Sequence, residues 1–128
     1  MEPGATSWVL VCDDTASIRL LIRINLELSG YEVVEASDGS VALELLRANL
    51  GRPPVVLVLD VQMEPMDGWE TLAAMRGDPA LAGDRVVMLT ASLQQGERQR
   101  AETAGVDAFL AKPFEPEELV DVVHRLAG

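Results

Sequence analysis

Polar side chains that could do chemistry follow directly on four of the chain's five short apolar segments. They are Asp13 and Asp14 after the first segment, Asp60 after the third, Thr90 after the fourth and Lys112 after the fifth. Two carboxylates about 4 Å apart repel by roughly 4 kcal/mol at an effective dielectric constant of about 20, so a site that gathers them needs positive charge. Oxygen ligands completed by water and by a phosphate oxygen are the Mg²⁺ pattern. These residues therefore predict a Mg²⁺ site that accepts a phosphate group.

Lys112 is the single lysine among ten basic residues. A lysine ammonium is a compact point charge, whereas the arginine guanidinium is a planar fork, so this choice favours a site that needs a small cation. The formal charges of the three carboxylates, one Mg²⁺ and Lys112 sum to zero. A competing interpretation is that Asp13 and Asp14 only cap the following helix, which one of them could do. The presence of Asp60 and Lys112 at other strand ends favours the functional interpretation.

Five apolar segments are predicted as strands, and amphipathic segments between and after them as helices. The predicted strands are Ser7–Cys12, Tyr31–Ala36, Pro54–Leu59, Arg85–Leu89 and Ala108–Ala111. The predicted helices are Thr15–Ser29, a second from the N-cap Asp38 to near Gly51, a third that begins at Asp67 and Gly68, a fourth over Leu93–Ala104 and a fifth over Glu115–Ala127. Asp38 is interpreted as a helix cap rather than a ligand.

Alternating strands and helices predict an α/β fold with a parallel sheet and right-handed crossovers. The second predicted strand carries Glu32 and Glu35 and the fifth is short, so these two are expected at the edges. We therefore predict a flavodoxin-like (βα)5 doubly wound domain, with a five-stranded parallel sheet in the order 2-1-3-4-5 and helices on both faces. Since the polar residues follow the strands, they should meet at the carboxyl edge of the sheet.

The predicted fourth helix is unusual because it is almost entirely polar. Its sequence from Gln94 to Arg100 offers almost no apolar face for packing on the sheet. We expect it to be weakly anchored, either as a frayed surface element or as a helix whose position responds to an event elsewhere. The sequence leaves both interpretations open.

Length and composition limit the function classes. We expect one domain over residues 1–128, with its core at about 7–127 and no output domain in the chain. A net charge of −11 disfavours direct contact with nucleic acid or anionic membranes. The longest apolar stretches are far shorter than the roughly 20 residues of a membrane helix, so no membrane insertion is expected. The lone Cys12 and the N-terminus without signal-peptide features make a cytoplasmic location the default expectation.

Taken together, the motifs resemble those of the receiver (REC) domain of two-component response regulators, across essentially the whole chain. An acidic pair or a Lys-Pro pair alone would be weak evidence, but the combination is highly specific. The motifs are Val11-Cys12-Asp13-Asp14 with Arg19 five residues beyond, Asp60 followed by Met66-Asp67-Gly68, Thr90-Ala91-Ser92, and Phe109-Leu110-Ala111-Lys112-Pro113-Phe114.

The resemblance implies a role for each site residue. Asp60 is the expected phosphoacceptor, which takes a phosphoryl group from a histidine kinase or histidine phosphotransfer protein. The expected Mg²⁺ ligands are Asp14, Asp60, the backbone carbonyl of Gln62 and, through a water molecule, Asp13. Lys112 is expected to pair first with Asp60 and then with a phosphoryl oxygen, and the Thr90 hydroxyl is expected to donate to another. Phosphoryl transfer needs mainly positioning and charge neutralisation, which this set supplies.

The resemblance also implies a signalling output. Movement of Thr90 toward the phosphoryl group would let Phe109 turn inward and change the surface of the fourth helix, fifth strand and fifth helix. The expected function is a phosphorylation switch that regulates a downstream effector protein or domain, with a phosphorylation-dependent dimer as one form. It is not expected to be an enzyme beyond its own phosphorylation and dephosphorylation. Phe109 as a fixed core aromatic is the alternative that the residues alone favour.

Two other classes of protein share some of these features. An aspartate-nucleophile phosphatase also uses Mg²⁺, but it usually carries a second Asp two residues after the nucleophile, where this chain has Gln62. An interaction module that keeps only the fold is the other alternative. The chain also departs from the family pattern at Glu64, which replaces the usual proline, while Gln62 and Ser92 occupy positions that tune phosphoryl lifetime. The resemblance also raises the expectation of a cis Lys112–Pro113 bond.

Overall fold

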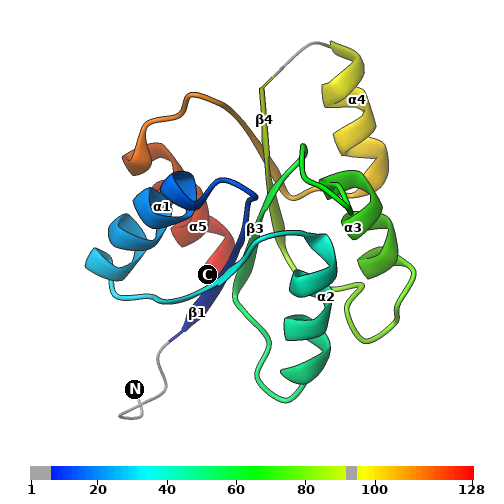
Figure 1. The fold of residues 1–128 in the computed structure, drawn as a ribbon, viewed down its shortest axis with the longest axis horizontal. Coiled ribbons are helices and arrows are strands. Elements are labelled where there is room, and N and C mark those ends of the chain that lie inside the picture. The colour runs from blue at the N-terminus through cyan, green and yellow to red at the C-terminus, as the bar shows by residue number, and fades with distance from the viewer. Residues whose placement is uncertain (1–6, 92–94) are drawn as a thin grey trace.

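The computed structural model describes residues 7–91 and 95–128, and within them the predicted architecture is confirmed (Figure 1). All strand pairs are parallel, and the sheet order is β2-β1-β3-β4-β5. The strands are β1 Trp8–Cys12, β2 Glu32–Ala36, β3 Val56–Asp60, β4 Val86–Thr90 and β5 Ala108–Ala111. The helices are α1 Ala16–Leu28, α2 Gly39–Ala48, α3 Gly68–Arg76, α4 Gln95–Ala104 and α5 Pro116–Ala127.

The sheet lies between two helical layers and therefore has a core on each face. Figure 1 shows α1 and α5 on one face and α2, α3 and α4 on the other. Alternate residues of β1, β3 and β4 enter the two cores, because successive strand side chains point to opposite faces. The core under α1 and α5 includes Val9, Val11, Val58, Leu89, Ile22, Leu26, Leu119 and Val123. The other core includes Leu10, Cys12, Leu57, Leu59, Met88, Leu46, Leu72 and Met75.

Two helices begin at aspartates that the sequence marks as caps. The Asp38 carboxylate accepts hydrogen bonds from the backbone N–H groups of Ser40 and Val41, which confirms its role as the cap of α2. Asp67 forms a capping box with Glu70 at the start of α3. Such caps satisfy backbone donors that have no partner inside the helix. They fix where α2 and α3 start relative to the sheet edge.

Several predicted boundaries were wrong by a few residues. Asp60 and Thr90 are the last residues of β3 and β4 rather than the first residues after them. Helix α2 ends at Ala48 rather than near Gly51, because Asn49 closes it with a side-chain bond to the Leu45 carbonyl and a backbone bond to that of Leu46. The predicted start of the fourth helix at Leu93 and the position of Ser92 lie outside the described residues.

Helix α4 has the thin attachment that its composition predicts. Among its described side chains only Ala101 is buried. A contact with α3 supplements this anchor, because the Arg100 guanidinium lies over the Trp69 ring, 4.4 Å from the ring centroid. In residues 7–91 and 95–128, the structure contains no helix of the length and apolarity that crossing a membrane requires.

Candidate functional site

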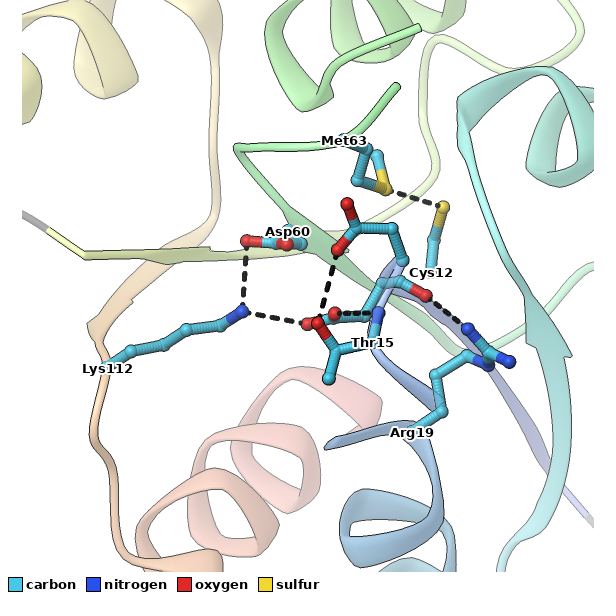
Figure 2. Close-up of polar contacts among 8 residues, drawn as sticks. Cys12, Thr15, Arg19, Asp60, Met63 and Lys112 are labelled. Atoms are coloured by element: carbon cyan, nitrogen blue, oxygen red, sulfur yellow. Dashed lines mark hydrogen bonds and ion pairs between the residues drawn. The ribbon is translucent and has the colours of Figure 1, made fainter. Parts of the chain in front are cut away.

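The carboxyl edge of the sheet brings together the predicted aspartates and Lys112 (Figure 2). One carboxylate oxygen from each of Asp13, Asp14 and Asp60 lies within 4.8 Å of the others. Asp13 follows β1 directly and Asp60 ends β3, and these two strands are neighbours in the sheet. Parallel neighbouring strands end at the same edge, which is why residues 47 positions apart in the sequence, from Asp13 to Asp60, meet there.

Lys112 bridges two of the carboxylates. Its Nζ atom lies 2.9 Å from Asp13 Oδ2 and 3.2 Å from Asp60 Oδ1. Burial alone lowers the pKa of the Lys112 ammonium, but the hydrogen bond and charge of Asp13 and the charge of Asp60 outweigh it, so the net shift of this pKa is upward. The lysine is therefore held in its charged form. The family resemblance assigned Asp60 as the partner of Lys112, and the contact with Asp13 is the shorter of the two.

The two adjacent aspartates differ in environment. Asp13 is fully buried, and its second oxygen, Oδ1, accepts a hydrogen bond from the Thr15 backbone N–H at 2.9 Å. Thr15 is the N-cap residue of α1, and no side chain caps this helix, so the interpretation of the aspartates as helix caps was wrong. Asp13 instead holds the loop before α1 and binds Lys112. Asp14 is exposed, and its carboxylate accepts a hydrogen bond from the Thr15 hydroxyl at 3.3 Å. Asp14 therefore retains most of its capacity to bind a ligand.

Asp60 lies at the floor of the site and is 4% exposed. Burial, followed by the negative charge of Asp13, raises the pKa of the Asp60 carboxyl, and the charge of Lys112 offsets part of that rise. A buried carboxylate with a like-charged neighbour is in an unfavourable state unless more positive charge is present. The donor set fits a hard divalent cation, because it consists of clustered carboxylate oxygens that one lysine only partly neutralises.

Thr90 and Phe109, the two residues of the predicted switch, lie on the neighbouring strands β4 and β5. Thr90 is buried at the end of β4, and its backbone carbonyl accepts a 2.7 Å hydrogen bond from the Lys112 N–H. Phe109 is half-buried on β5 and packs against the core on the side of α3 and α4. It also lines a small cavity of about 200 Å³ beside Ala101 of α4. Phe109 is thus neither a fully buried core residue nor a surface one.

A cavity of about 570 Å³ opens at this edge of the sheet. Its lining includes the predicted residues Asp14, Gln62 and Thr90. It also includes residues that the sequence did not place in the site, namely Val61, Met63, Asp67, Trp69, Ala91 and Glu97. Glu64, which replaces the usual proline, lines the cavity as well and is exposed. Glu64 and Glu97 therefore line the same cavity as Asp14 and Thr90.

Arg19 supports the site from outside the cavity. This arginine belongs to the first family motif, but the resemblance implied no role for it. Its Nη1 atom donates to the Asp13 backbone carbonyl at 2.7 Å, and its Nε atom pairs with the Glu35 carboxylate at 3.0 Å. This arginine ties the loop after β1 to β2. The only sequence feature that could have indicated this contact is the acidic residue Glu35 on β2, which we had used to place that strand at the edge of the sheet.

Cys12 packs beneath the site rather than acting in it. Its thiol is buried and donates to the Met63 sulfur at 3.4 Å. Burial, and after it the negative charges of Asp38 and Asp13, raises the pKa of the Cys12 thiol to about 12. A thiol with so high a pKa is a poor nucleophile at neutral pH.

Two proline bonds near the site are cis. The Lys112–Pro113 bond is cis, which confirms the expectation from the family resemblance. The Glu64–Pro65 bond is also cis, and the sequence had given no indication of it. It lies in the loop where Glu64 replaces the usual proline.

The fold and site define a class: a doubly wound α/β domain with an acidic, lysine-bridged site at the carboxyl edge of its sheet. Comparison with known proteins narrows the class to one family. The sequence matches the response regulator receiver domain over residues 9–124, and the chain belongs to this family. It is thus a receiver domain of the two-component response regulators, as the motifs predicted.

Individual relatives agree with this assignment. The probable transcriptional regulator ycf27 of Guillardia theta is 38% identical over 87% of this chain and 41% of its own length. The alkaline phosphatase synthesis transcriptional regulatory protein PhoP of Bacillus subtilis is 37% identical over 87% of this chain and 44% of its own length. The chain therefore spans less than half the length of these two curated relatives. Among solved structures, the chemotaxis protein CheY4 of Vibrio cholerae superposes with a TM-score of 0.86 at 33% identity, over 95% of this chain and 99% of that one.

Proposed function

We propose that Asp60 is the phosphoacceptor of this receiver domain and that Mg²⁺ assists its phosphorylation. The observation that carries the proposal is the sharing of Lys112 between Asp13 and Asp60 beside an exposed Asp14. Asp13 has both oxygens engaged by Thr15 and Lys112, so it suits an indirect role through water. Asp14, Asp60 and the backbone carbonyl of Gln62 would then hold the metal directly.

Each residue then has one task in the transfer. Bound Mg²⁺ would neutralise charge that builds up on the phosphoryl oxygens. An Asp60 carboxylate oxygen attacks phosphorus, the bond from phosphorus to the donor nitrogen breaks, and the electron pair leaves with that nitrogen. Lys112 moves from the Asp60 carboxylate to a phosphoryl oxygen, and the Thr90 hydroxyl donates a hydrogen bond to another. Phosphoryl transfer depends on this positioning more than on covalent chemistry by the protein.

The partners follow from the chemistry of the transfer. We propose a histidine kinase or histidine phosphotransfer protein as the donor and a downstream effector protein or domain as the target. Thr90 and Phe109 would carry the signal to the surface of α4, β5 and α5. The half-buried position of Phe109 supports this role, because a side chain in that state has room to change its exposure. A phosphorylation-dependent dimer is part of the same proposal.

The test is phosphorylation with a small-molecule donor in the presence of Mg²⁺. We expect the intact protein to gain the mass of one phosphoryl group, and we expect the Asp60→Asn variant and the wild type in EDTA to gain none. Asp14→Asn should raise the Mg²⁺ concentration needed, whereas Asp121→Asn on the exposed side of α5 serves as a matched control. A phosphoryl adduct that persists in Asp60→Asn would overturn the assignment. Continuous turnover of the donor without a lasting adduct would favour the phosphatase alternative.

A further inference from the structure

The wall of the site cavity carries negative charge beyond the proposed metal ligands. Glu64 comes from the loop after β3 and Glu97 from α4, and both line the cavity together with Asp67. The Asp67 carboxylate is engaged in the capping box of α3, which leaves Glu64 and Glu97 as the wall's other acidic groups. Among the described residues, neither glutamate forms an ion pair.

No cation on the described part of the wall balances these two glutamates. Lys112, the cation nearest the acceptor, is shared by Asp13 and Asp60. Arg100 lies on the same helix as Glu97, but its guanidinium is over the Trp69 ring, 4.4 Å from the centroid. This contact adds to the attachment of α4 to α3, and Trp69 itself lines the cavity beside Glu97. The guanidinium keeps its charge beside Trp69, but the described residues that line the cavity include four acidic residues and no cation, so the wall has a net negative charge.

The charge of the wall acts on the group that leaves during phosphorylation. Asp60 is 4% exposed, and the cavity lies beside it, because its chain neighbours Val61 and Gln62 line the cavity. A donor that reaches Asp60 through this cavity has its leaving group roughly in line with the attacking oxygen. An acyl phosphate releases a carboxylate: the P–O bond breaks and the oxygen keeps the electron pair and a negative charge. A phosphoramidate-type donor breaks a P–N bond, and its already protonated nitrogen leaves as a neutral amine. Only the first places a growing negative charge beside Glu64 and Glu97.

We propose that Glu64 and Glu97 are specificity-determining residues that favour phosphodonors with a nitrogen leaving group over acyl phosphates. This inference rests on the proposed function of Asp60 and adds the class of donor that the site selects. Free anionic metabolites of the acyl phosphate class are disfavoured by the wall, whereas a phosphorylated imidazole on a protein is tolerated. The selection is electrostatic, so it weakens as salt screens the charges.

The test compares acetyl phosphate with phosphoramidate as donors to the wild type, Glu64→Gln, Glu97→Gln and the double variant. Adduct formation is followed by intact mass at a Mg²⁺ concentration that saturates each variant, as determined from quenching of tryptophan fluorescence. We expect the double variant to raise the rate ratio of acetyl phosphate to phosphoramidate about 3- to 10-fold at low ionic strength, and about 1 M salt to remove most of the gain. Glu102→Gln, an exposed carboxylate on α4 outside this cavity, is the matched control and should leave the ratio unchanged.

The outcomes separate this inference from the function on which it rests. Equal acceleration with both donors, an unchanged ratio, or an equal shift in Glu102→Gln would overturn the role of the two glutamates while Asp60 remains the acceptor. Absence of any Asp60-dependent adduct from either donor would overturn both proposals. Thermal unfolding of each variant, monitored by circular dichroism, shows whether the compared proteins are folded, and Glu64→Asp and Glu97→Asp should keep the wild-type ratio because they keep the charge.

Discussion

Replacement of Lys112 by methionine should destabilise the metal-free protein by about 2–4 kcal/mol at pH 7. The ammonium lies 2.9 Å from Asp13 Oδ2 and 3.2 Å from Asp60 Oδ1. At an effective dielectric constant of about 20 these contacts correspond to about 6 and about 5 kcal/mol of gross attraction. The desolvation of the lysine cancels a large part of that sum, and its side chain remains 25% exposed. The net loss should therefore fall at the lower end of the range for a broken buried ion pair.

The expected loss of stability in Lys112→Met comes from the repulsion between the carboxylates that remain. A second substitution, Asp60→Asn, tests this cause. Oxygens of Asp13 and Asp60 lie within 4.8 Å of each other, where the repulsion is about 3.5 kcal/mol at a dielectric constant of about 20. In an Asp60→Asn background one of the lysine's two similar contacts has already lost its charge. Lys112→Met should then cost about half as much as it does in the wild type.

Urea unfolding monitored by circular dichroism measures all four members of this double-mutant cycle, in EDTA and in Mg²⁺. Mg²⁺ should recover part of the stability of Lys112→Met, because the metal supplies positive charge to the same carboxylates. Arg85→Met, which removes an exposed cation before β4, is the control and should change stability by less than about 0.5 kcal/mol. A Lys112→Met loss below about 1 kcal/mol, or an equal loss in the Asp60→Asn background, would refute the reasoning.

Two further predictions concern the floor of the site. Asp60→Asn should be more stable than the wild type in EDTA at pH 7. Burial and the charge of Asp13 raise the pKa of Asp60 above its ordinary value of 3.8, so ionisation of Asp60 opposes folding of the wild type. The stability difference between the two proteins should therefore shrink as the pH falls toward 3.8. Unfolding free energies of both proteins across pH 3–7 test the sign, and a variant less stable than the wild type at pH 7 would contradict it. Gly68→Ala should cost about 1–3 kcal/mol, because a Cβ atom there would lie 2.3 Å from the Asp60 backbone carbonyl oxygen. Gly83→Ala, whose Cβ meets nothing within 4 Å, is the comparison, and equal melting temperatures for the two variants would argue against the close contact.

The sequence predicted the fold well because its apolar segments differ in a way that sets the sheet order. The central strands β1, β3 and β4 are buried along their whole lengths, whereas β2 has an exposed Glu32 and β5 is partly buried throughout. The central strands are covered by helices on both faces, whereas β2 and β5 lie at the edges of the sheet. The order then dictates that Asp13, Asp60 and Lys112 meet, so the centre of the site was predictable as well.

The wall of the site was not predictable to the same degree. Glu97 belongs to a helix without an apolar stripe, so periodicity does not determine which of its side chains faces the cavity. Trp69 is the second residue of α3, and its partner Arg100 lies on α4. No pattern in the sequence links these two residues. Contacts between surface helices depend on rotations and distances that become known only once the layers have packed.

The sharing of Lys112 matters for the proposed transfer itself. When Asp60 becomes an acyl phosphate, its carboxylate charge disappears and a phosphoryl group of about −2 charge stands nearby. A lysine held by Asp60 alone would lose its anchor at that step. Because Asp13 binds the ammonium at 2.9 Å and is not the proposed acceptor, Lys112 would keep one fixed partner before and after transfer. The ammonium then needs only to exchange Asp60 for a phosphoryl oxygen, which lets one small cation stabilise both states of the switch.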